Sequence, residues 1–386
     1  MQRNVDFWVS IYSQYTTRQG LIHDAKYIDR VYEVLNLDAP EAQGSHFVRE
    51  AKRHWREILL GLHRKYKQGH GKLPDDLTAE EKHVAEMFQD LNDPNKFANA
   101  ANRKRLRFQL GQKDRFLDGL KASGQYLPVM EQIFRSEGLP VELTRLPFVE
   151  SSFNVHARSK VGASGIWQFM RSTGKLFLKV NDAVDERNDP IRATEAAAKL
   201  LRMNFESLRT WPLAVTAYNH GRKGLMRAVR RVGSDELEDV VSDYKSRTFG
   251  FASSNFFTEL LAAIEVERNA EKYFGKVERL HPIQSYEVRI PDYVPYENLV
   301  QLLKLNSSSI RDLNPGLTEA VFEGKRLIPA GYTLRLPQDP TLGSEAAARV
   351  FMAGYAEIPS VFKLRSQQRF IKYGRKYYGK TPTLKE

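Results

Sequence analysis

The sequence predicts a mainly helical protein with a small mixed α/β module near its C-terminal end. Apolar residues recur at three- and four-residue spacing through most of residues 1–276, which is the period of amphipathic helices. No strand-like alternation interrupts residues 125–274. After Pro282 the pattern changes, and "YEVRI" alternates as a half-buried strand does.

The composition is that of an ordinary soluble globular protein. A length of 386 residues predicts two or three domains, with 41% hydrophobic and 27% charged residues. The absence of cysteine excludes disulfides, thiolate metal sites and cysteine nucleophiles. A net charge of +12 favours polyanionic partners, either nucleic acid or an anionic envelope surface, and charge alone does not choose between them.

The first residues carry no visible export signal. "MQRNVDFWVSIYSQY" lacks a basic segment followed by an apolar one, and no stretch of the sequence approaches the roughly 20 apolar residues of a membrane helix. The protein is therefore expected to be cytoplasmic, or to have an export signal outside this numbering.

Residues 1–120 are predicted to form an N-terminal helical region. Ile28, Val31, Tyr32 and Leu35 have helical spacing. The basic runs "RHWREILLGLHRKYKQGHGK" and "NRKRLRFQLGQKDRF" are either solvated helix faces or a patch for an anionic surface.

Residues 121–276 are predicted to form an all-α domain that presents a glutamate. Gly138–Pro140 is expected to start a helix, because proline suits the first turn. Leu143, Leu146 and Glu150 then share one face, so the carboxylate continues an apolar stripe. Pro147 is expected to bend this helix, since it lacks an N–H.

Further elements follow in order. Asp189-Pro190 is expected to cap the next long helix, and Gly221 to end the helix of "WPLAVTAYNHG". "FFTELLAAIEVERNAEKYF" predicts another helix. Residues 282–337 predict strands at "YEVRIPDYV" and "GKRLIPAGYTLRLP" around helices at "YENLVQLLKL" and "SSSIRDLNPGL". Residues 338–386 are expected to be a loose basic tail ending in "RFIKYGRKYYGKTPTLKE".

Glu150 is the candidate catalytic residue. A glutamate on an apolar stripe loses hydration, which raises its pKa. It can then stay protonated near neutral pH and donate a proton to a glycosidic oxygen. The alternative is a helix-end glutamate bonded to a nearby lysine or arginine.

Two other motifs supply candidate binding residues. In "SKVGASGIWQFM", the small residues 162–165 let the backbone approach a ligand closely, Trp167 can supply an apolar platform, and Gln168 has both a donor and an acceptor. In "TAYNHG", the Tyr218 hydroxyl can orient a carboxyl group. The alternatives are a tight turn before a helix for the first motif and core packing for the second.

Taken in this order, "FVESSFN", "VGASGIWQFM" and "TAYNHG" resemble the lysozyme-like family-1 lytic transglycosylases of bacterial cell walls. That family is marked by Glu-Ser, then Gly-Leu-Met-Gln or a variant, then Ala-Tyr-Asn. "ELTRLPFVESSFN", "DERNDPIRATEAAAKLL", "FGFASSNFFTELLAA" and "NVDFWVSIYSQY" look like its membrane-bound lytic murein transglycosylase D branch. The resemblance covers most of residues 1–337.

The resemblance implies a lysozyme-like helical domain that cuts peptidoglycan in the periplasm or cell envelope. Glu150 would protonate the oxygen between N-acetylmuramic acid and N-acetylglucosamine, while the 2-acetamido group supports the cation. The glutamate would then take the proton of the same sugar's 6-hydroxyl, leaving a 1,6-anhydro ring. No cofactor or metal is implied, the implied partner is the glycan strand of peptidoglycan, and no nucleic acid is expected. The net charge adds an anionic envelope surface as a further candidate partner.

Site residues are also implied by the resemblance. Asp185 and Arg187 match a structural ion pair near the cleft, and Trp167 stands where methionine is commoner. The residues that would bind substrate or position the glutamate are Ser151, Ser159, Ser164, Gln168, Met170, Tyr218 and Asn219.

A single carboxylate fits this chemistry. Ordinary glycosidases need two carboxyl groups, whereas attack by a tethered hydroxyl needs one acid/base. No second carboxylate has a comparable setting, although Glu142, Asp182, Asp185 and Asp189 are available. A goose-lysozyme-like hydrolase that uses water, a non-catalytic wall-binding protein and, from charge alone, a nucleic-acid-binding protein remain alternatives.

The segment 282–337 resembles a degenerate peptidoglycan-binding lysin motif (LysM). "YEVRI", "LVQLLKL", "IRDLNPGL" and "GKRLIP" fall in the expected order, but "PDYVPYENL" stands where Gly-Asp-Thr-Leu is usual. The module is expected either to bind glycan or to pack against the catalytic domain.

Overall fold

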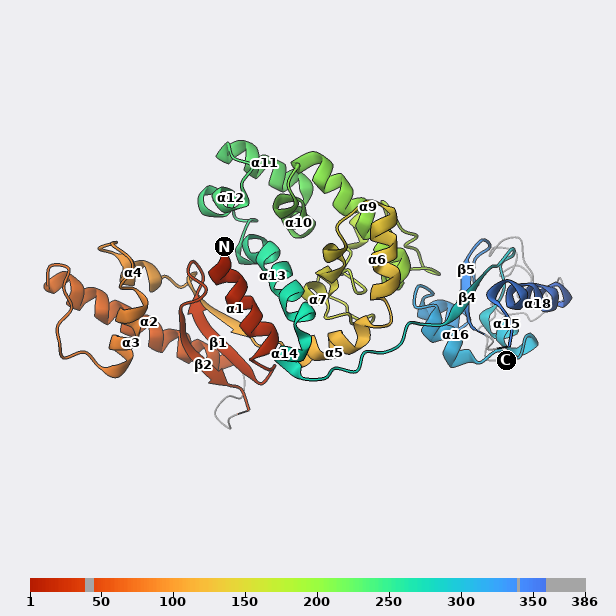
Figure 1. Ribbon diagram of the computed structural model, residues 1–386, viewed down its shortest axis with the longest axis horizontal. Helices are drawn as coiled ribbons and strands as arrows, with labels where there is room; N and C mark the ends of the chain where they lie inside the picture. The colour runs from red at the N-terminus through yellow and green to blue at the C-terminus, as the bar shows by residue number, and fades with distance from the viewer. Residues whose placement is uncertain (39–44, 339–340, 359–386) are drawn as a thin grey trace. The chain divides into compact units, whose positions relative to one another are not determined.

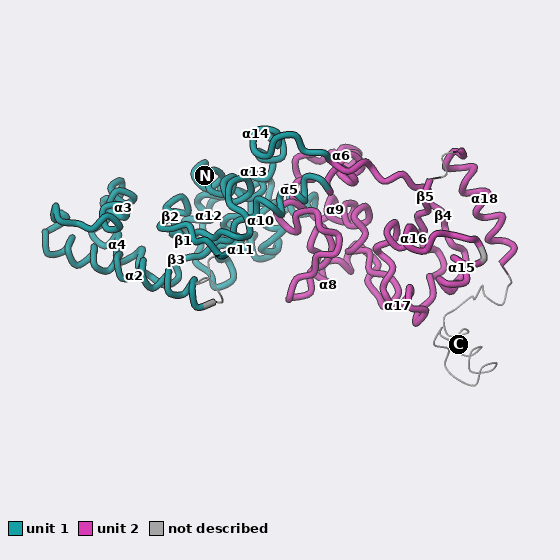
Figure 2. Tube along the Cα trace, turned by 90° about the horizontal axis from the view of Figure 1, so that it is seen from below, with its two compact units in different colours: residues 1–121, 201–278 teal, residues 122–200, 279–386 magenta. Residues whose placement is uncertain are grey.

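The computed structural model describes residues 1–38, 45–338 and 341–358 (Figure 1). The chain forms two compact units, residues 1–121 with 201–278 and residues 122–200 with 279–386 (Figure 2). The prediction of a mainly helical chain is confirmed. The expected catalytic domain, 121–276, contributes to both units, and its boundaries stay a prediction.

The first unit is built around a three-stranded antiparallel sheet of order β2-β1-β3. Its strands are β1 (Gln19–Asp24), β2 (Val31–Asn36) and β3 (Leu106–Leu110). The prediction of a helix over residues 28–35 is therefore wrong. Tyr32 forms a bulge, since His23 pairs with Val31 and Ile22 with Glu33. The bulge shifts the alternation, so Tyr32 and Leu35 are both buried at a spacing that imitates a helix.

The helices of this unit pack on each other, and α1 and α2 also contact the sheet. The N-terminal helix α1 (Gln2–Ser13) lies along α13 (Phe251–Arg268), where Asn4 Nδ2 donates to Asn255 Oδ1 at 3.2 Å. The others are α2 (Ser45–Gln68), α3 (Ala79–Met87), α4 (Lys96–Ala100), α5 (Lys113–Ser123), α10 (Trp211–His220), α11 (Arg222–Val232), α12 (Leu237–Asp243) and α14 (Ala270–Phe274).

Helix ends in this fold follow the local signals in the sequence. Gly221, with a φ of 87°, ends α10 as predicted. Asp189 Oδ1 accepts hydrogen bonds from the backbone N–H groups of Ile191 and Arg192, so it caps α9 (Pro190–Leu208) as predicted. Helix α9 carries the chain from the second unit into the first.

The second unit contains the predicted glutamate segment and the C-terminal module. Its first part contains α6 (Leu127–Ser136), a 3-10 helix (Val141–Arg145), α7 (Leu146–Glu150), α8 (Arg171–Gly174) and a 3-10 helix (Glu186–Asn188). The module pairs β4 (Ser285–Arg289) with β5 (Thr333–Pro337) in antiparallel fashion. Its helices are α15 (Tyr296–Leu302), α16 (Ser307–Leu313), α17 (Glu319–Phe322) and α18 (Ser344–Glu357).

Helix α18 lies inside the segment that the sequence predicts as a loose tail, so that prediction is wrong for Ser344–Glu357. Ala347, Phe351 and Tyr355 recur every four residues and are buried. Phe351 and Tyr355 join the module's core with Val288. The apolar stripe outweighs the basic character of the surrounding chain. The expected basic end, "RFIKYGRKYYGKTPTLKE", lies outside the described residues.

Candidate functional site

Glu150 is the last residue of α7, a helix of five residues. The predicted single helix from Gly138 does not form, because Gly138 has a φ of 64° and directly follows the C-cap of α6. Instead, a 3-10 helix leads into α7, and the two meet beside Pro147. Proline cannot donate the N–H that would continue one helix through this point. The predicted apolar stripe itself is confirmed, since Leu143 and Leu146 are buried.

The backbone directly after Glu150 is left-handed at two non-glycine residues. Ser152 has a φ of 51° and Phe153 a φ of 57°. The N–H groups of Ser151 and Phe153 both donate to the Pro147 carbonyl, at 3.0 and 3.2 Å. Left-handed backbone costs roughly 1–2 kcal/mol per such residue, so packing must hold it. Phe153 supplies that packing, because its buried ring contacts the Phe148 ring edge-on, with ring centroids 4.7 Å apart.

Glu150 is half-buried, and its carboxyl group has no hydrogen-bond or ion-pair partner among the described residues. Burial raises the pKa of Glu150 to about 8. The alternative of a helix-end glutamate bonded to a lysine or arginine is therefore excluded within the described part of the chain. A carboxyl with this pKa is mostly protonated at neutral pH, as a general acid must be.

The Ser151 side chain connects α7 to the segment of residues 159–170, the small-residue loop. Its Oγ donates to the Ile166 carbonyl at 2.9 Å. On the other side of the loop, Ser159 Oγ accepts from the Ala163 N–H at 2.9 Å. Both predicted serines therefore act on the loop's backbone, which fixes the main chain close to Glu150.

Gly165 is required by the chain itself. A Cβ at this position would lie 1.8 Å from the Arg187 carbonyl oxygen, and the φ of Gly165 is 76°. By contrast, a Cβ on Gly162 would meet nothing within 4 Å. The close approach expected from the sequence is therefore made at Gly165, by the backbone of Arg187 and not by a ligand. Gly162 has open space around it.

The Arg187 side chain fixes the backbone of the loop. Its guanidinium pairs with Asp185, through Nε to Oδ1 at 2.9 Å and Nη2 to Oδ2 at 2.7 Å, so the predicted structural ion pair is present. Its Nη1 donates to the carbonyls of Gly162 and Phe169, at 2.8 and 3.0 Å. One buried cation therefore joins both ends of the loop.

The prediction that Trp167 offers a platform to ligand is wrong. The side chain is fully buried, and its ring stacks on Phe134 with centroids 5.9 Å apart. Its Nε1 donates to Thr194 Oγ1 at 2.9 Å. Spacing in the sequence shows that Trp167 follows the loop, but not that its ring turns into the core.

The other candidate residues of the loop differ in how far their side chains are exposed to solvent. Ser164 is buried, and its Oγ bonds Asn188 Oδ1 at 2.5 Å. Gln168 has a φ of 48°, and its Nε2 donates to the carbonyls of Ala157 and Gly165, at 3.1 and 2.8 Å. Its Oε1 has no partner within the described ranges. Met170 is 40% exposed where the loop ends. Gln168 and Met170 thus keep atoms available to a ligand.

Tyr218 and Asn219 lie on α10 in the first unit. The Tyr218 ring stacks on Phe256, with centroids 6.4 Å apart and an interplanar angle of 3°. Asn219 Oδ1 accepts from Ser253 Oγ at 2.8 Å. The second unit brings Glu150, Ser151 and the loop together, whereas these two residues are positioned by α10 and α13.

Three of the other carboxylates considered from the sequence are in ion pairs with arginine. Asp182 pairs with Arg326, Asp185 with Arg187 and Asp189 with Arg335. The latter two carboxylates are buried, and both are held as partners for arginine. Glu150 differs from these three carboxylates, because it has no ion-pair partner within the described residues.

The sequence allowed the module to pack against the catalytic part of the chain, but it did not identify the residues that make the contact. Asp189 was identified as a helix cap, but its second oxygen accepts from Arg335 of β5. The backbone of 183–185 pairs with 316–318. Such contacts join residues more than a hundred positions apart, and no local pattern announces them.

Two further features of the described residues bear on the kind of site present. Among the described residues, no group of three or more His, Cys, Asp or Glu side chains could hold a metal ion. In the same part of the chain, no helix has the length and apolar character needed to cross a membrane.

Comparison with known proteins points to one family. Residues 130–241 match the family model of the transglycosylase SLT domain. The chain is 27% identical over 186 residues to membrane-bound lytic murein transglycosylase D of Escherichia coli strain K12, covering 47% of this chain and 40% of that protein. It is 32% identical over 111 residues to a putative tributyltin chloride resistance protein of Alteromonas sp. strain M-1, covering 28% and 53%.

The chain thus spans about half, or less, of the length of the curated relatives it matches. Among solved structures, an inactive variant of the lytic transglycosylase Slt from Pseudomonas aeruginosa covers 61% of this chain and 34% of its own, at 14% identity and a TM-score of 0.31. That similarity is too low to carry an argument. The family match covers Glu150, the loop and α10, and so residues 130–241 are similar to transglycosylase SLT domains.

Proposed function

We propose that this protein is a peptidoglycan lytic transglycosylase of the cell envelope, with Glu150 as its single acid/base. The observation that carries the proposal is a half-buried carboxyl, without a protein partner in the described residues and with a pKa raised to about 8, inside an SLT domain. The family relative is a murein transglycosylase by name, which supports the substrate class.

The first step uses the protonated carboxyl as an acid. Glu150 donates its proton to the oxygen that links N-acetylmuramic acid to N-acetylglucosamine, and the C1–O bond of the muramic acid residue breaks. The leaving sugar departs with that proton as a hydroxyl group. A burial-raised pKa favours this step, because it keeps the acid loaded at neutral pH.

The second step uses the resulting carboxylate as a base. It takes the proton of the 6-hydroxyl of the same muramic acid residue, whose oxygen bonds to C1 and closes the 1,6-anhydro ring. Glu150 ends protonated, as it began. The nucleophile is part of the substrate, so no second carboxylate is needed to activate water.

The remaining site residues receive supporting roles in this proposal. Gln168 and Met170 contact the glycan from the loop, with Ser151, Ser159 and Ser164 holding that loop in shape. Tyr218 and Asn219 contribute from α10. The net charge of +12 favours an anionic envelope surface as a further partner, and a periplasmic location follows from the substrate.

The test is a digest of purified peptidoglycan with the wild-type protein and with Glu150→Gln, analysed by mass spectrometry. We expect wild type to release fragments with anhydromuramic ends and the variant to release none. Reducing ends would assign a hydrolase of the goose-lysozyme kind. Binding without any cleavage by the wild type would assign a non-catalytic wall-binding protein.

A further inference from the structure

The C-terminal module is joined to the site by a short stretch of paired backbone. The Asp185 N–H donates to the Gly316 carbonyl at 2.7 Å, and the Thr318 N–H donates to the Ala183 carbonyl at 3.1 Å. Val184 lies between them, fully buried in the apolar core of the module. One edge of the module is therefore occupied by a segment from the catalytic part of the same chain.

A buried ion pair fixes the same contact on the other side. Arg335 Nη1 donates to Asp189 Oδ2 at 2.6 Å, and the two side chains are only 11% and 7% exposed. Asn314 binds both backbone groups of Arg335. Its Oδ1 accepts from the Arg335 N–H at 2.9 Å, and its Nδ2 donates to the Arg335 carbonyl at 2.8 Å. The backbone of Arg335 in β5 is therefore fixed, and its guanidinium is held against Asp189.

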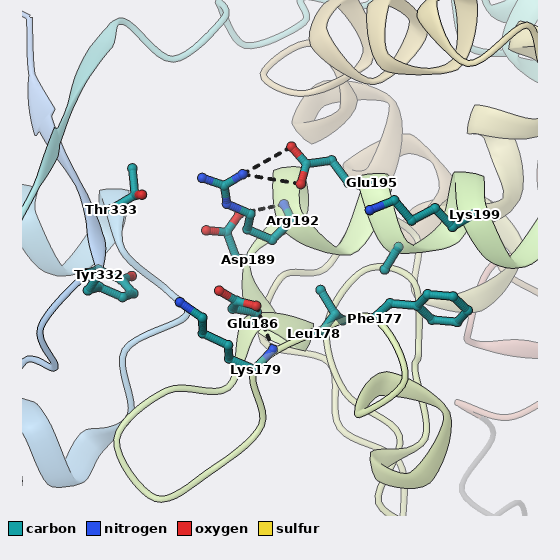
Figure 3. A pocket seen from close by; sticks show the side chains of 12 residues that line it. Phe177, Leu178, Lys179, Glu186, Asp189, Arg192, Glu195, Lys199, Tyr332 and Thr333 are labelled. Atoms are coloured by element: carbon teal, nitrogen blue, oxygen red, sulfur yellow. Dashed lines mark hydrogen bonds and ion pairs between the residues drawn. The ribbon is translucent and has the colours of Figure 1, made fainter.

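Around this pair the interface is polar and incompletely filled. A cavity of about 250 Å³ lies between the start of α9 and the start of β5. Figure 3 shows Tyr332 and Thr333 on one side, and Arg192 bonded to Glu195 on the other. Two ion pairs join α9 to the module on this side: the buried Arg335–Asp189 pair, and a longer one of 4.0 Å between Arg192 and Glu287 of β4.

The contact leads to Glu150 through a short series of bonds. Arg187 lies between the two docked residues Asp185 and Asp189, and it holds the carbonyls of Gly162 and Phe169. Within that loop, the Ile166 carbonyl accepts from the hydroxyl of Ser151, the neighbour of Glu150. A shift of the docked segment would therefore be passed to the catalytic carboxyl.

We propose that Arg335 is a positioning residue for the reaction at Glu150, and that the module acts as a brace for the catalytic loop. This inference rests on the proposed transglycosylase function. It assigns the module a role in turnover, distinct from the glycan binding that its resemblance to lysin motifs suggests. The module's Gly316–Thr318 edge is taken by its own chain, which fits a brace.

The variants are chosen to break the pair without breaking the helix cap. Asp189→Asn keeps an oxygen that can accept from the N–H groups of Ile191 and Arg192, but it loses the charge that pairs with Arg335. Arg335→Gln removes the other charge, and with it the pair between Arg335 Nε and the exposed Glu287 within the module. Arg335→Lys restores the charge without the planar fork. Arg349→Gln is the matched control, since within the described residues Arg349 pairs only with exposed Glu345 on α18.

The experiment measures kcat and KM on purified glycan strands, together with hydrogen exchange at the amides of Asp185 and Thr318. We expect kcat of Asp189→Asn and Arg335→Gln to fall about tenfold at nearly unchanged KM, because a misplacement of about 1 Å can cost up to 10²-fold. Arg335→Lys should recover part of the loss, the double variant should lose no more than a single one, and Arg349→Gln should match wild type.

Several results would overturn the brace. A raised KM at unchanged kcat would assign the module to glycan binding. Unchanged kcat and KM would show that the contact plays no part in turnover. If the wild type cleaves no glycan, the proposed function fails, and hydrogen exchange alone decides the brace. Faster exchange at both amides in the two variants would then support it, and unchanged exchange would refute it.

Discussion

The Ser151 hydroxyl donates a hydrogen bond of 2.9 Å to the carbonyl of Ile166, joining the residue after Glu150 to the middle of the small-residue loop. Both partners are set by local backbone. Ser151 follows the short α7, and Ile166 follows Gly165, whose positive φ of 76° favours glycine. The position of the candidate acid is therefore coupled to the loop that is expected to contact substrate.

Ser151→Ala should lower turnover several-fold and stability modestly. The variant loses one partly buried hydrogen bond, worth roughly 0.5–1.5 kcal/mol, and leaves the Ile166 carbonyl without this donor. Peptidoglycan turnover and thermal unfolding are the measurements, with Ser172→Ala on the exposed face of α8 as the control. Unchanged turnover in Ser151→Ala would show that the coupling is not needed.

Gly165→Ala should destabilise the protein far more than Gly162→Ala. Both glycines have positive φ, at 76° and 91°, so both substitutions strain the backbone. Only the Gly165 substitution also drives a methyl group into the Arg187 carbonyl, at 1.8 Å. Chemical denaturation of the two variants gives the comparison, and equal midpoints would contradict the close approach.

The activity of the wild type should decline as the pH rises through about 8. The pKa of Glu150 is raised to about 8 by burial, and above it the acid form is lost. The pH profile of kcat on isolated glycan strands is the measurement. A descending limb near the ordinary glutamate pKa would mean that the carboxyl is fully hydrated.

Glu150→Gln should be more stabilising at pH 8 than at pH 5. The folded-state pKa of Glu150 lies above the unfolded value, so the folded protein binds the proton more tightly. The stability this contributes is fully present below the unfolded pKa and is lost as the pH rises through the folded pKa. Glutamine stays neutral at both values. Thermal melts of variant and wild type at the two pH values test this sign, and a constant difference between them would refute it.

Tyr218→Phe should weaken turnover less than Glu150→Gln does. The ring stacks on Phe256, and phenylalanine preserves that contact while removing the hydroxyl. Kinetics on the same glycan strands measure the change. A loss as large as that of the glutamine variant would assign the tyrosine a direct part in proton transfer.

Local signals predicted much of the fold. Asp189 before Pro190 and Gly221 after α10 act as the sequence indicated, because caps depend on neighbouring residues. The strand at Val31–Asn36 was missed, since its bulge imitates a helical spacing. Trp167 was misassigned because an exposed and a buried aromatic ring look alike in a sequence. Arg335 could not be found at all, as its partner Asp189 is brought close only by tertiary packing.

Helix α18 has a practical bearing on how the C-terminal module can be isolated. The strand pattern invites a cut after Pro337, yet such a fragment would lack Phe351, Tyr355 and Ile358, which cover one side of its interior. The bare apolar face left behind would promote self-association. A fragment intended for binding or folding work should therefore extend at least through Ile358.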